Sequence, residues 1–176
     1  MAHTFWFTGL SGVGKTTIAI GTKNLLKDEG LRISMLDGDE IRGKIHSGFS
    51  FSPSDIKKNN LFISKICKKQ SKDFDIIMVP IISPYEISRS KANELLGEYF
   101  SLIYVCAPLR TLEKRDTKGL YLKQKKGEID NLIGVSTSNI YEIPSNYDLL
   151  INTETEDINS SINKLYAFIL EKINKR

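Results

Sequence analysis

The apolar and polar positions of the chain follow two different periods. Short runs of consecutive apolar residues, typical of buried strands, alternate with longer segments whose apolar residues recur every three to four positions, as on one face of a helix. The pattern predicts strands at residues 3–8, 32–36, 76–79, 102–105 and 147–151. It predicts helices at residues 15–28, 54–69, 85–99, 109–126 with a break at Gly119, and 157–172. This alternation favours an α/β fold with a mostly parallel sheet, helices on both faces and ligands at the carboxyl ends of the strands.

A glycine-rich run follows the first predicted strand. Residues 9–16 read Gly-Leu-Ser-Gly-Val-Gly-Lys-Thr, which fits the phosphate-binding P-loop, and the segment after them has helical spacing. In such a loop, backbone N–H groups surround the phosphates of a nucleoside triphosphate, the lysine supplies a positive charge and the threonine hydroxyl can ligate Mg²⁺. The sequence therefore predicts a nucleotide site at the end of this strand.

Two carboxylates follow the second predicted strand. Asp37 and Asp39 lie in the run Leu-Asp-Gly-Asp, which a doubly wound sheet would place beside the P-loop, where one of them can act on Mg²⁺ or on an attacking hydroxyl. The third predicted strand is followed by Pro80 rather than by the acid found there in motor-type ATPases. The sequence also lacks the Asn-Lys-x-Asp motif of a switch GTPase after a late strand. These residues favour a small-molecule kinase.

Length and composition set further limits. The 176 residues are enough for a single domain, residues 1–176, that buries a core without disulfides or structural metal. Cys67 and Cys106 have neither CxxC spacing nor paired histidines beside them, so we expect buried structural thiols. The net charge of +4 arises from scattered lysine pairs without interleaved aromatics, which indicates solvated helix faces rather than a nucleic-acid site. With no leader and no bilayer-length apolar stretch, we expect a cytoplasmic protein that does not enter a membrane.

Several runs of residues, in a fixed order along the chain, resemble adenylylsulfate kinase. They are residues 9–17, Leu36–Asp39 with Arg42, Ile82–Tyr85 with Arg89, Arg115–Asp116, Lys118–Tyr121, and Tyr141–Glu142 with Pro144. The resemblance covers about residues 5 to 150 and implies a P-loop kinase fold that uses ATP and Mg²⁺. It implies transfer of the γ-phosphoryl group to the ribose 3′-hydroxyl of a 5′-nucleotide whose phosphate carries a second small acidic group. It also suggests a homodimer.

The resemblance implies roles for the residues that match its motifs. The expected catalytic residues are Lys15, Asp37, Asp39, Ser83 and Lys118, and the expected Mg²⁺ ligands are Thr16 and Asp37. The expected ATP-binding residues are Gly9, Ser11, Gly12, Val13, Gly14, Lys15, Thr16, Thr17 and Arg115. The expected acceptor-binding residues are Asp39, Arg42, Phe51, Asn59, Ile82, Ser83, Lys118 and Leu132.

Two further expectations concern a lid segment and the role of Ser83. Arg115, Lys118 and Tyr121 belong to an expected lid at about residues 110–130, where basic residues concentrate and would serve anionic ligands. In the family, transient phosphorylation of the serine that is Ser83 here is one proposal. Direct in-line transfer needs no protein nucleophile, so we interpret Ser83 as a backbone and acceptor contact.

Two positions depart from the family pattern. Ile56 stands where the family has an arginine that helps to hold adenylyl sulfate, and Leu132 where it has a phenylalanine of the adenine clamp. A charged hydrogen bond is worth ~1.5–3 kcal/mol and base stacking ~1–3 kcal/mol, so the two losses should change which nucleotide is favoured. We expect both side chains to line one pocket that suits cytidine diphosphoramidate, the acceptor of a similar branch that serves capsule phosphoramidate synthesis. Adenylyl sulfate is the alternative acceptor, and a nucleotide-binding protein without turnover is a further alternative that the intact Lys15 and Asp37 disfavour.

Overall fold

The computed structural model describes residues 1–38, 41 and 50–174, so that two expected site residues, Asp39 and Arg42, lie outside the described residues. Five strands form one sheet in the order β2-β3-β1-β4-β5, and every neighbouring pair is parallel. The strands are β1 (His3–Thr8), β2 (Ile33–Met35), β3 (Ile76–Val79), β4 (Phe100–Cys106) and β5 (Leu149–Asn152). The predicted α/β fold with a parallel sheet is confirmed.

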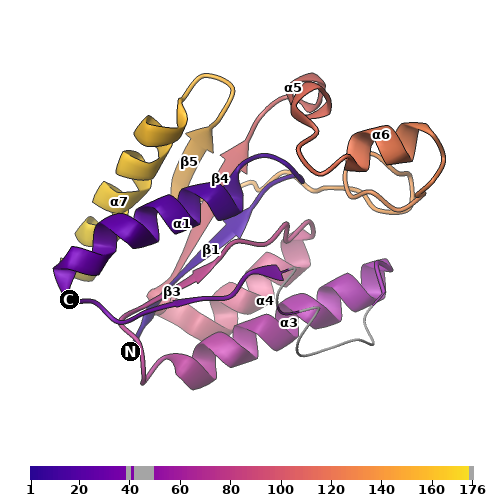
Figure 1. Cartoon of the computed structure of the whole chain (residues 1–176). Helices are drawn as coiled ribbons and strands as arrows, with labels where there is room; N and C mark the ends of the chain where they lie inside the picture. Colours follow the sequence, from indigo (N-terminus) through magenta and orange to yellow (C-terminus); the bar gives the residue numbers. More distant parts are fainter. Residues whose placement is uncertain (39–40, 42–49, 175–176) are drawn as a thin grey trace.

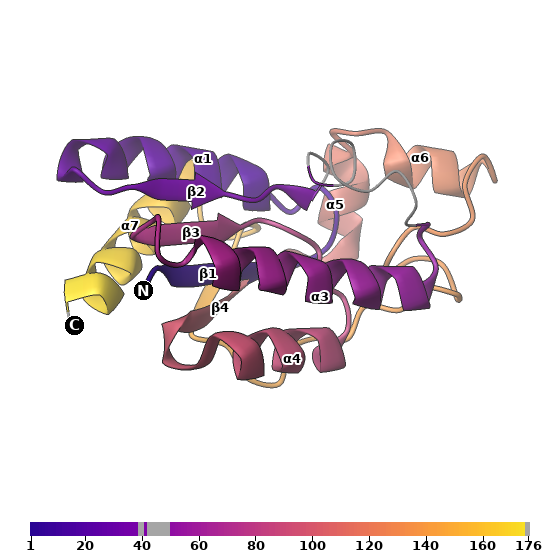
Figure 2. The same cartoon turned by 90° about the horizontal axis from the view of Figure 1, so that it is seen from below.

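Helices cover both faces of this sheet. On one face lie α1 (Lys15–Leu25) and α7 (Ile158–Asn174), and on the other lie α3 (Pro53–Gln70) and α4 (Glu86–Leu96) (Figures 1 and 2). The short helices α5 (Leu109–Arg115) and α6 (Leu120–Lys125) lie beyond the carboxyl ends of the strands (Figure 1). Two 3₁₀ turns, η1 (Leu26–Glu29) and η2 (Gly97–Tyr99), extend α1 and α4.

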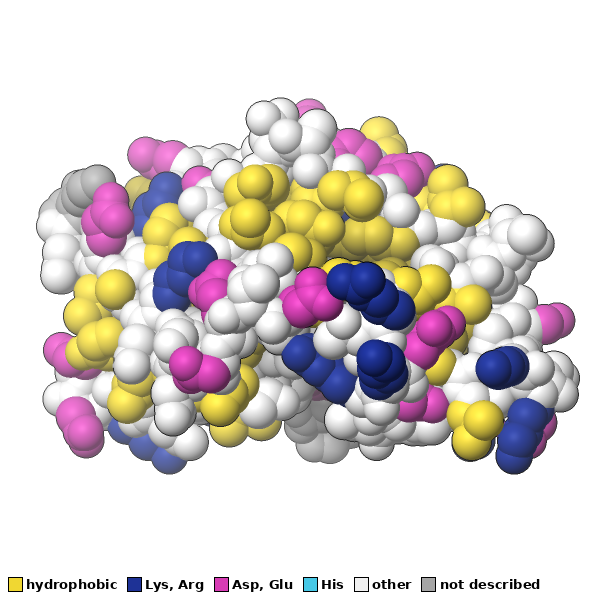
Figure 3. All heavy atoms as spheres, turned by 90° about the horizontal axis from the view of Figure 1, so that it is seen from above, with side chains coloured by type: hydrophobic (Ala, Val, Ile, Leu, Met, Phe, Trp, Pro, Cys, Tyr) yellow, Lys and Arg dark blue, Asp and Glu magenta, His cyan; other side chains and the backbone are white. Residues whose placement is uncertain are grey.

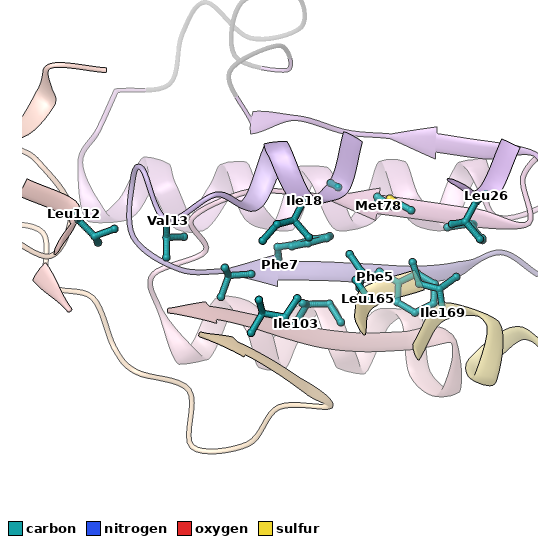
Figure 4. Packing of buried hydrophobic residues seen from close by; sticks show 14 of the residues in the cluster. Phe5, Phe7, Val13, Ile18, Leu26, Met78, Ile103, Leu112, Leu165 and Ile169 are labelled. Atoms are coloured by element: carbon teal, nitrogen blue, oxygen red, sulfur yellow. The ribbon is translucent and has the colours of Figure 1, made fainter. Parts of the chain in front are cut away.

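The core is divided by the sheet because successive strand residues point to opposite faces. Phe5 and Phe7 of β1 pack with α1 and α7, and Figure 4 draws Phe7 beside Ile18 and Phe5 beside Leu165. Trp6, between them, packs against α3 and α4. All six residues of β1 are buried, which explains why the central strand is read in the sequence as a continuous run rather than as an alternating one.

Local sequence signals account for most helix ends. The Ser52 hydroxyl accepts a hydrogen bond from the N–H of Asp55, and Pro53 occupies the first turn, so α3 begins where the sequence predicted. The predicted break in the helix at residues 109–126 is present: α5 ends at Arg115, and Gly119, with a φ of 65°, is the N-terminal cap of α6. Asp116 ends α5 with a φ of 23°, and its carboxylate accepts the N–H groups of Tyr121 and Leu122, which caps α6.

The two cysteines differ in burial. Cys67 is buried on α3, as predicted, and burial raises the pKa of its thiol to about 12. Cys106 is only partly buried, which corrects the sequence prediction, because it is the last residue of β4, where the covering helices leave the strand end open. Within the described residues, no helix combines the length and the hydropathy that crossing a bilayer requires.

Candidate active site

A cavity of about 480 Å³ opens where the carboxyl ends of β1, β2 and β3 meet. Four separate segments supply its walls: the P-loop with the start of α1, the residues after β2, the residues after β3, and the segment from Thr117 to Ile133. This is the edge at which an open parallel sheet binds its ligands. The position of the cavity therefore agrees with the position that the motif order predicts.

The P-loop is shaped by glycines with positive φ. Gly9, Gly12 and Gly14 have φ values of 150°, 74° and 101°, which favour glycine strongly over other residues. Gly14 is the N-terminal cap of α1, so the first N–H groups of this helix lie at the cavity, where they and the helix dipole favour a bound anion. The Lys15 ammonium donates hydrogen bonds of 2.8 Å to the carbonyl oxygens of Gly9 and Leu10. The loop thus provides N–H donors and one buried cation for phosphates.

Thr16 and Asp37 form a pair of oxygen ligands beside this loop. The Thr16 hydroxyl, in the first turn of α1, donates a 2.8 Å hydrogen bond to Oδ2 of Asp37, which follows β2. The described part of the chain holds no cluster of three or more His, Cys, Asp or Glu residues that could bind a metal on its own. Mg²⁺ commonly takes one or two protein oxygens and completes its shell with phosphates and water. The pair therefore fits Mg²⁺ that is bound together with a nucleotide.

A second, much smaller cavity of about 20 Å³ adjoins the first. The two share Gly38, Ile81, Ile82 and Ile133 in their walls. The rest of the smaller wall comes from the start of α3 and the loop after β3: Ser50, Ile56, Asn59, Asn60, Ser83 and Pro84. The loop after β3 therefore separates the P-loop cavity from a pocket beneath α3.

This loop is held in a rare conformation. Ser83 has a φ of 42°, and its hydroxyl accepts a 3.0 Å hydrogen bond from the indole N–H of Trp6. The guanidinium of Arg89, which is fully buried, donates to the carbonyl of Ser83 at 2.7 Å and to that of Glu142 at 2.8 Å. The backbone of Ser83 is thus fixed from β1, α4 and the segment that contains Glu142.

Thr8 and Tyr141 complete the support of the loop. The Thr8 hydroxyl lies 2.9 Å from the carbonyl oxygen of Ile82 and 3.0 Å from that of Ser83, and it can donate to either. It also hydrogen-bonds the phenol of Tyr141 at 2.9 Å. Burial raises the pKa of Tyr141 above its usual range, so this phenol stays protonated. The network therefore carries no charge on Tyr141 at neutral pH.

Helix α6 contacts the P-loop through one side chain. The Tyr121 hydroxyl donates a 2.8 Å hydrogen bond to the carbonyl of Ser11, and the ring is buried over Gly12. Burial, with the nearby Asp116 carboxylate as a second cause, raises the pKa of Tyr121 to about 12. The phenol therefore remains a donor throughout the neutral range, and α6 is tied to the loop.

The structure brings most of the predicted residues to the two cavities. The larger is lined by Ser11, Gly12, Gly14, Lys15, Thr16, Thr17, Asp37, Phe51, Ile82, Lys118 and Leu132. The smaller is lined by Asn59, Ile82 and Ser83. Phe51 remains 47% exposed.

Three predicted ATP-binding residues lie differently. The side chain of Val13 is buried in the core behind the P-loop, so only its backbone is available to a ligand of the loop. Gly9 lies at the base of the loop, against Val105. The guanidinium of Arg115 donates to the hydroxyl and carbonyl oxygens of Thr153, outside the lining of the cavity.

The structure also corrects the expectation that Ile56 and Leu132 line one pocket. Ile56 packs with Tyr85 and Ile133 and lines the smaller cavity. Leu132 belongs to the core cluster on the α1 side and lines the larger cavity. The reason is that Ile56 lies on α3, which covers the face of the sheet opposite α1. The N–H of Leu132, in contrast, donates to the side chain of Gln124 in α6.

Sequence reasoning missed several residues of the site. Asn60, Thr117 and Ile133 line the cavities, and Trp6 supports the loop after β3. Asn60 carries a signal that could have found it, because it is a polar residue within the apolar stripe of α3. Trp6 carries none, since a tryptophan in a buried strand reads as core.

Comparison with known proteins agrees with this geometry. A sequence model of the family described as "Adenylylsulphate kinase" matches residues 1–152. An adenylyl-sulfate kinase of Halothermothrix orenii is 40% identical over 169 residues, which cover 96% of this chain and 90% of the relative. An adenylyl-sulfate kinase of Bacteroides thetaiotaomicron is 39% identical over 172 residues, which cover 97% of this chain and 85% of the relative.

A solved structure extends the likeness to the fold. The Mycobacterium tuberculosis APS kinase CysC, in complex with AMPPNP and APS, superimposes with a TM-score of 0.87 at 29% identity, over 98% of both chains. The predicted P-loop kinase fold is thereby confirmed. Because the family model spans most of the chain and the relatives match nearly all of it, the chain belongs to the adenylylsulphate kinase family.

Proposed function

We propose that the protein transfers the γ-phosphoryl group of ATP to the ribose 3′-hydroxyl of a 5′-nucleotide whose phosphate carries a second acidic group. The observation that carries this proposal is the Thr16–Asp37 pair beside Lys15, at a cavity that adjoins a second pocket. Adenylyl sulfate is the first candidate acceptor. Curated relatives at 40% and 39% identity are adenylyl-sulfate kinases, and this likeness supports the same acceptor here.

The residues of the larger cavity divide the work of phosphoryl transfer. Lys15 exchanges its bonds to the carbonyls of Gly9 and Leu10 for the β- and γ-phosphates of ATP. Thr16 and Asp37 would hold Mg²⁺, and the ion would supply positive charge for the phosphates. Lys118 lines the same cavity and adds a second cation there. The expected roles of Asp39 at the transfer site and Arg42 on the acceptor phosphate fall on residues outside those described.

Ser83 acts as an acceptor contact rather than as a nucleophile. Its hydroxyl is buried and already accepts a hydrogen bond from Trp6, and its carbonyl is held by Arg89. Activation of a serine requires a base within hydrogen-bond reach of its hydroxyl. The partner that the structure gives that hydroxyl is the Trp6 indole N–H, which is a donor only. Direct in-line transfer from ATP to the acceptor hydroxyl is therefore the reaction we propose.

The segment at about residues 110–130 forms a lid over the bound phosphates. It includes Lys118, which lines the larger cavity, and Tyr121, which holds the Ser11 carbonyl of the P-loop. Closure of such a segment excludes water and brings cations to the phosphates. Hydrogen exchange of residues 110–130 should slow when an ATP analogue and acceptor are added together. Equal protection with and without ligands would refute the lid.

Cytidine diphosphoramidate is the second candidate acceptor, and one observation favours it. Among the described residues that line the smaller cavity, none is a lysine or an arginine, and Ile56 occupies its wall. Leu132, at the larger cavity, offers an aliphatic surface in place of an aromatic one. A smaller base fits these walls, and the amide N–H groups of the terminal phosphoramidate can donate to the oxygen acceptors of Asn59 and Asn60 in the smaller cavity.

One experiment tests the proposal and separates the two acceptors. ADP release is measured by a coupled assay with adenylyl sulfate and cytidine diphosphoramidate side by side, and the 3′-phosphorylated product is identified by mass spectrometry. Turnover with either acceptor supports the kinase, and the larger kcat/KM identifies the acceptor. Lys15→Ala is the control for contaminating kinases. If the purified protein turns over neither nucleotide at millimolar concentrations, the proposed function is wrong.

We also propose that the protein is a homodimer through an apolar face. A hollow of about 390 Å³ behind the P-loop is walled by apolar side chains that include Tyr104, Ile140 and Ile143. Ile143 is 70% exposed and Ile140 is 55% exposed, and Figure 3 shows hydrophobic side chains gathered on one face. Large exposed apolar areas mark association surfaces. Sedimentation should give twice the mass of the chain, and Ile143→Asp should give monomers; a monomeric wild type contradicts the proposal.

A further inference from the structure

Asn60 is a buried polar residue with half of its amide unused. It lies on α3 among the residues that face the interior, and only 3% of it is exposed. Its Nδ2 donates a 2.9 Å hydrogen bond to the carbonyl of Ile56, one turn earlier. Its Oδ1 is buried and accepts no hydrogen bond from any residue that the structure describes. An acceptor in this state destabilises the fold.

The orientation of this amide is fixed. Turning it over would bring Oδ1 against the carbonyl oxygen of Ile56 and would lose the existing hydrogen bond. The free group is therefore an acceptor and cannot become a donor. Leucine, which has nearly the same shape, would remove the unpaired oxygen. A buried polar group that opposes stability in this way is typical of a functional site.

Asn60 lies at the smaller cavity, next to Asn59. Asn59 is also buried, and its Oδ1 also has no partner. The cavity of about 20 Å³ has room for one group the size of a water molecule. It lies directly behind Ile81 and Ile82, which also line the larger cavity of the proposed active site. The two side chains that carry these unpaired oxygens thus line a space of that size.

We infer that Asn60 is a specificity-determining residue that favours acceptors whose terminal group carries an N–H or O–H donor over acceptors whose terminal group presents only oxygen acceptors. This inference rests on the proposed kinase function. A terminal sulfate and a terminal phosphoramidate are both tetrahedral and each carries one negative charge, so charge and shape separate them poorly. Only the amidate can donate a hydrogen bond to a fixed oxygen. A site built around such a bond discriminates against the analogue that lacks it.

The test compares Asn60→Leu with the wild type on two acceptors that share one base. The acceptors are adenylyl sulfate and adenosine 5′-diphosphoramidate, which differ in their terminal group. We expect the ratio of kcat/KM for the amidate to kcat/KM for the sulfate to fall by about 10-fold in Asn60→Leu, the upper range for one neutral hydrogen bond. The KM for ATP should stay unchanged. The melting temperature should stay equal or rise, because the variant removes an unpaired buried oxygen.

A matched control makes the same chemical change elsewhere. Asn93→Leu lies on the exposed side of α4 and should leave the ratio as it is. If Asn60→Leu changes both acceptors equally, Asn60 serves packing or a buried water and the inference is wrong. If the wild type phosphorylates neither acceptor nor cytidine diphosphoramidate, the proposed function fails instead. Turnover by the wild type with an unmoved ratio therefore overturns this inference alone.

Discussion

Replacing Gly9 with alanine should disrupt the P-loop without touching a side chain that binds nucleotide. Gly9 has a φ of 150°, a conformation that is open almost only to glycine. A Cβ at this position would overlap the carbonyl oxygen of Val105 and would lie 3.1 Å from Cγ1 of Val13. Val105 is fully buried in β4 and is paired with Ile151 of β5, so its carbonyl cannot withdraw. The loop must move instead.

The magnitude follows from two terms. The backbone strain is worth ~1–3 kcal/mol and the overlap in a packed interior ~1–3 kcal/mol. Together they give a loss of about 2–6 kcal/mol, against a total stability of about 5–15 kcal/mol for a domain. Gly30→Ala is the matched control, because Gly30 also has a positive φ, 68°, but nothing lies within 4 Å of its Cβ position. That variant should lose only ~1–2 kcal/mol.

Urea unfolding followed by tryptophan fluorescence measures both variants, since Trp6 is next to the site on β1. We expect Gly9→Ala to lower the midpoint by clearly more than Gly30→Ala, with an unchanged slope. We also expect weaker ATP binding in Gly9→Ala only, because its loop has shifted. Equal losses of stability in the two variants would refute the reasoning, since they differ in the overlap with Val105.

Four further predictions concern other parts of the molecule. Lys15→Ala should lower kcat by ~10²-fold or more in steady-state assays, because one preorganised cation is removed, and retention of half the activity would exclude the role. Tyr121→Phe should raise the KM for ATP by about 2- to 10-fold, since one hydrogen bond to Ser11 is lost. Tyr166→Phe on α7 removes a hydrogen bond to Glu29 instead and should leave this KM unchanged. The Arg32 guanidinium holds the pKa of Asp75 at about 2, below its value of about 3.9 in the unfolded chain. The ion pair therefore stabilises the folded protein fully above about pH 4, and this stabilisation is lost as the pH falls through about 2. Asp75→Asn should therefore lower the free energy of unfolding by less than about 1 kcal/mol at neutral pH, because the pair is partly exposed. In urea unfolding, the difference in this free energy between wild type and variant should shrink in acid. A difference that grows in acid would contradict the prediction. Ile56→Arg and Leu132→Phe should each shift the ratio of kcat/KM towards adenylyl sulfate. The two shifts, expressed as free energies, should add within ~0.5 kcal/mol, because the side chains line different cavities. Strong coupling in a double-mutant cycle would show a shared contact.

Elements with a single strong signal could be predicted from the sequence. Buried runs such as residues 76–79 coincide with β3, and the amphipathic period of residues 54–69 coincides with α3 within one residue at either end. The P-loop was equally readable, because its geometry depends on glycines within one short segment. The division of residues 109–126 into two helices was readable at Gly119, but the end of the first helix at Arg115 was not. It depends on Asp116, which adopts a positive φ and caps α6 with its own carboxylate.

Residues that act through tertiary contacts could not be predicted. Arg89 stood in a motif next to Ser83, but its hydrogen bond to Glu142 reaches a segment 53 residues away. The unpaired oxygen of Asn60 depends on how α3 meets the loop after β3. Contacts of this kind do not appear as a hydrophobic period in the sequence, since they depend on the distances between folded elements rather than on the order of residues.

This difference explains how the acceptor can change while the kinase motif stays intact. Phosphate is bound by backbone N–H groups and Lys15 of one continuous loop, so almost any change in that loop alters a motif residue. The pocket next to it is built from Ile56 and Asn60 of α3, Ser83 of the loop after β3, and Ile133. These side chains also pack the interior, so their substitution reads in the sequence as an ordinary core change. Under the proposed function, selection of the terminal group falls to positions that resemble packing residues, and the nucleotide motif carries no information about it.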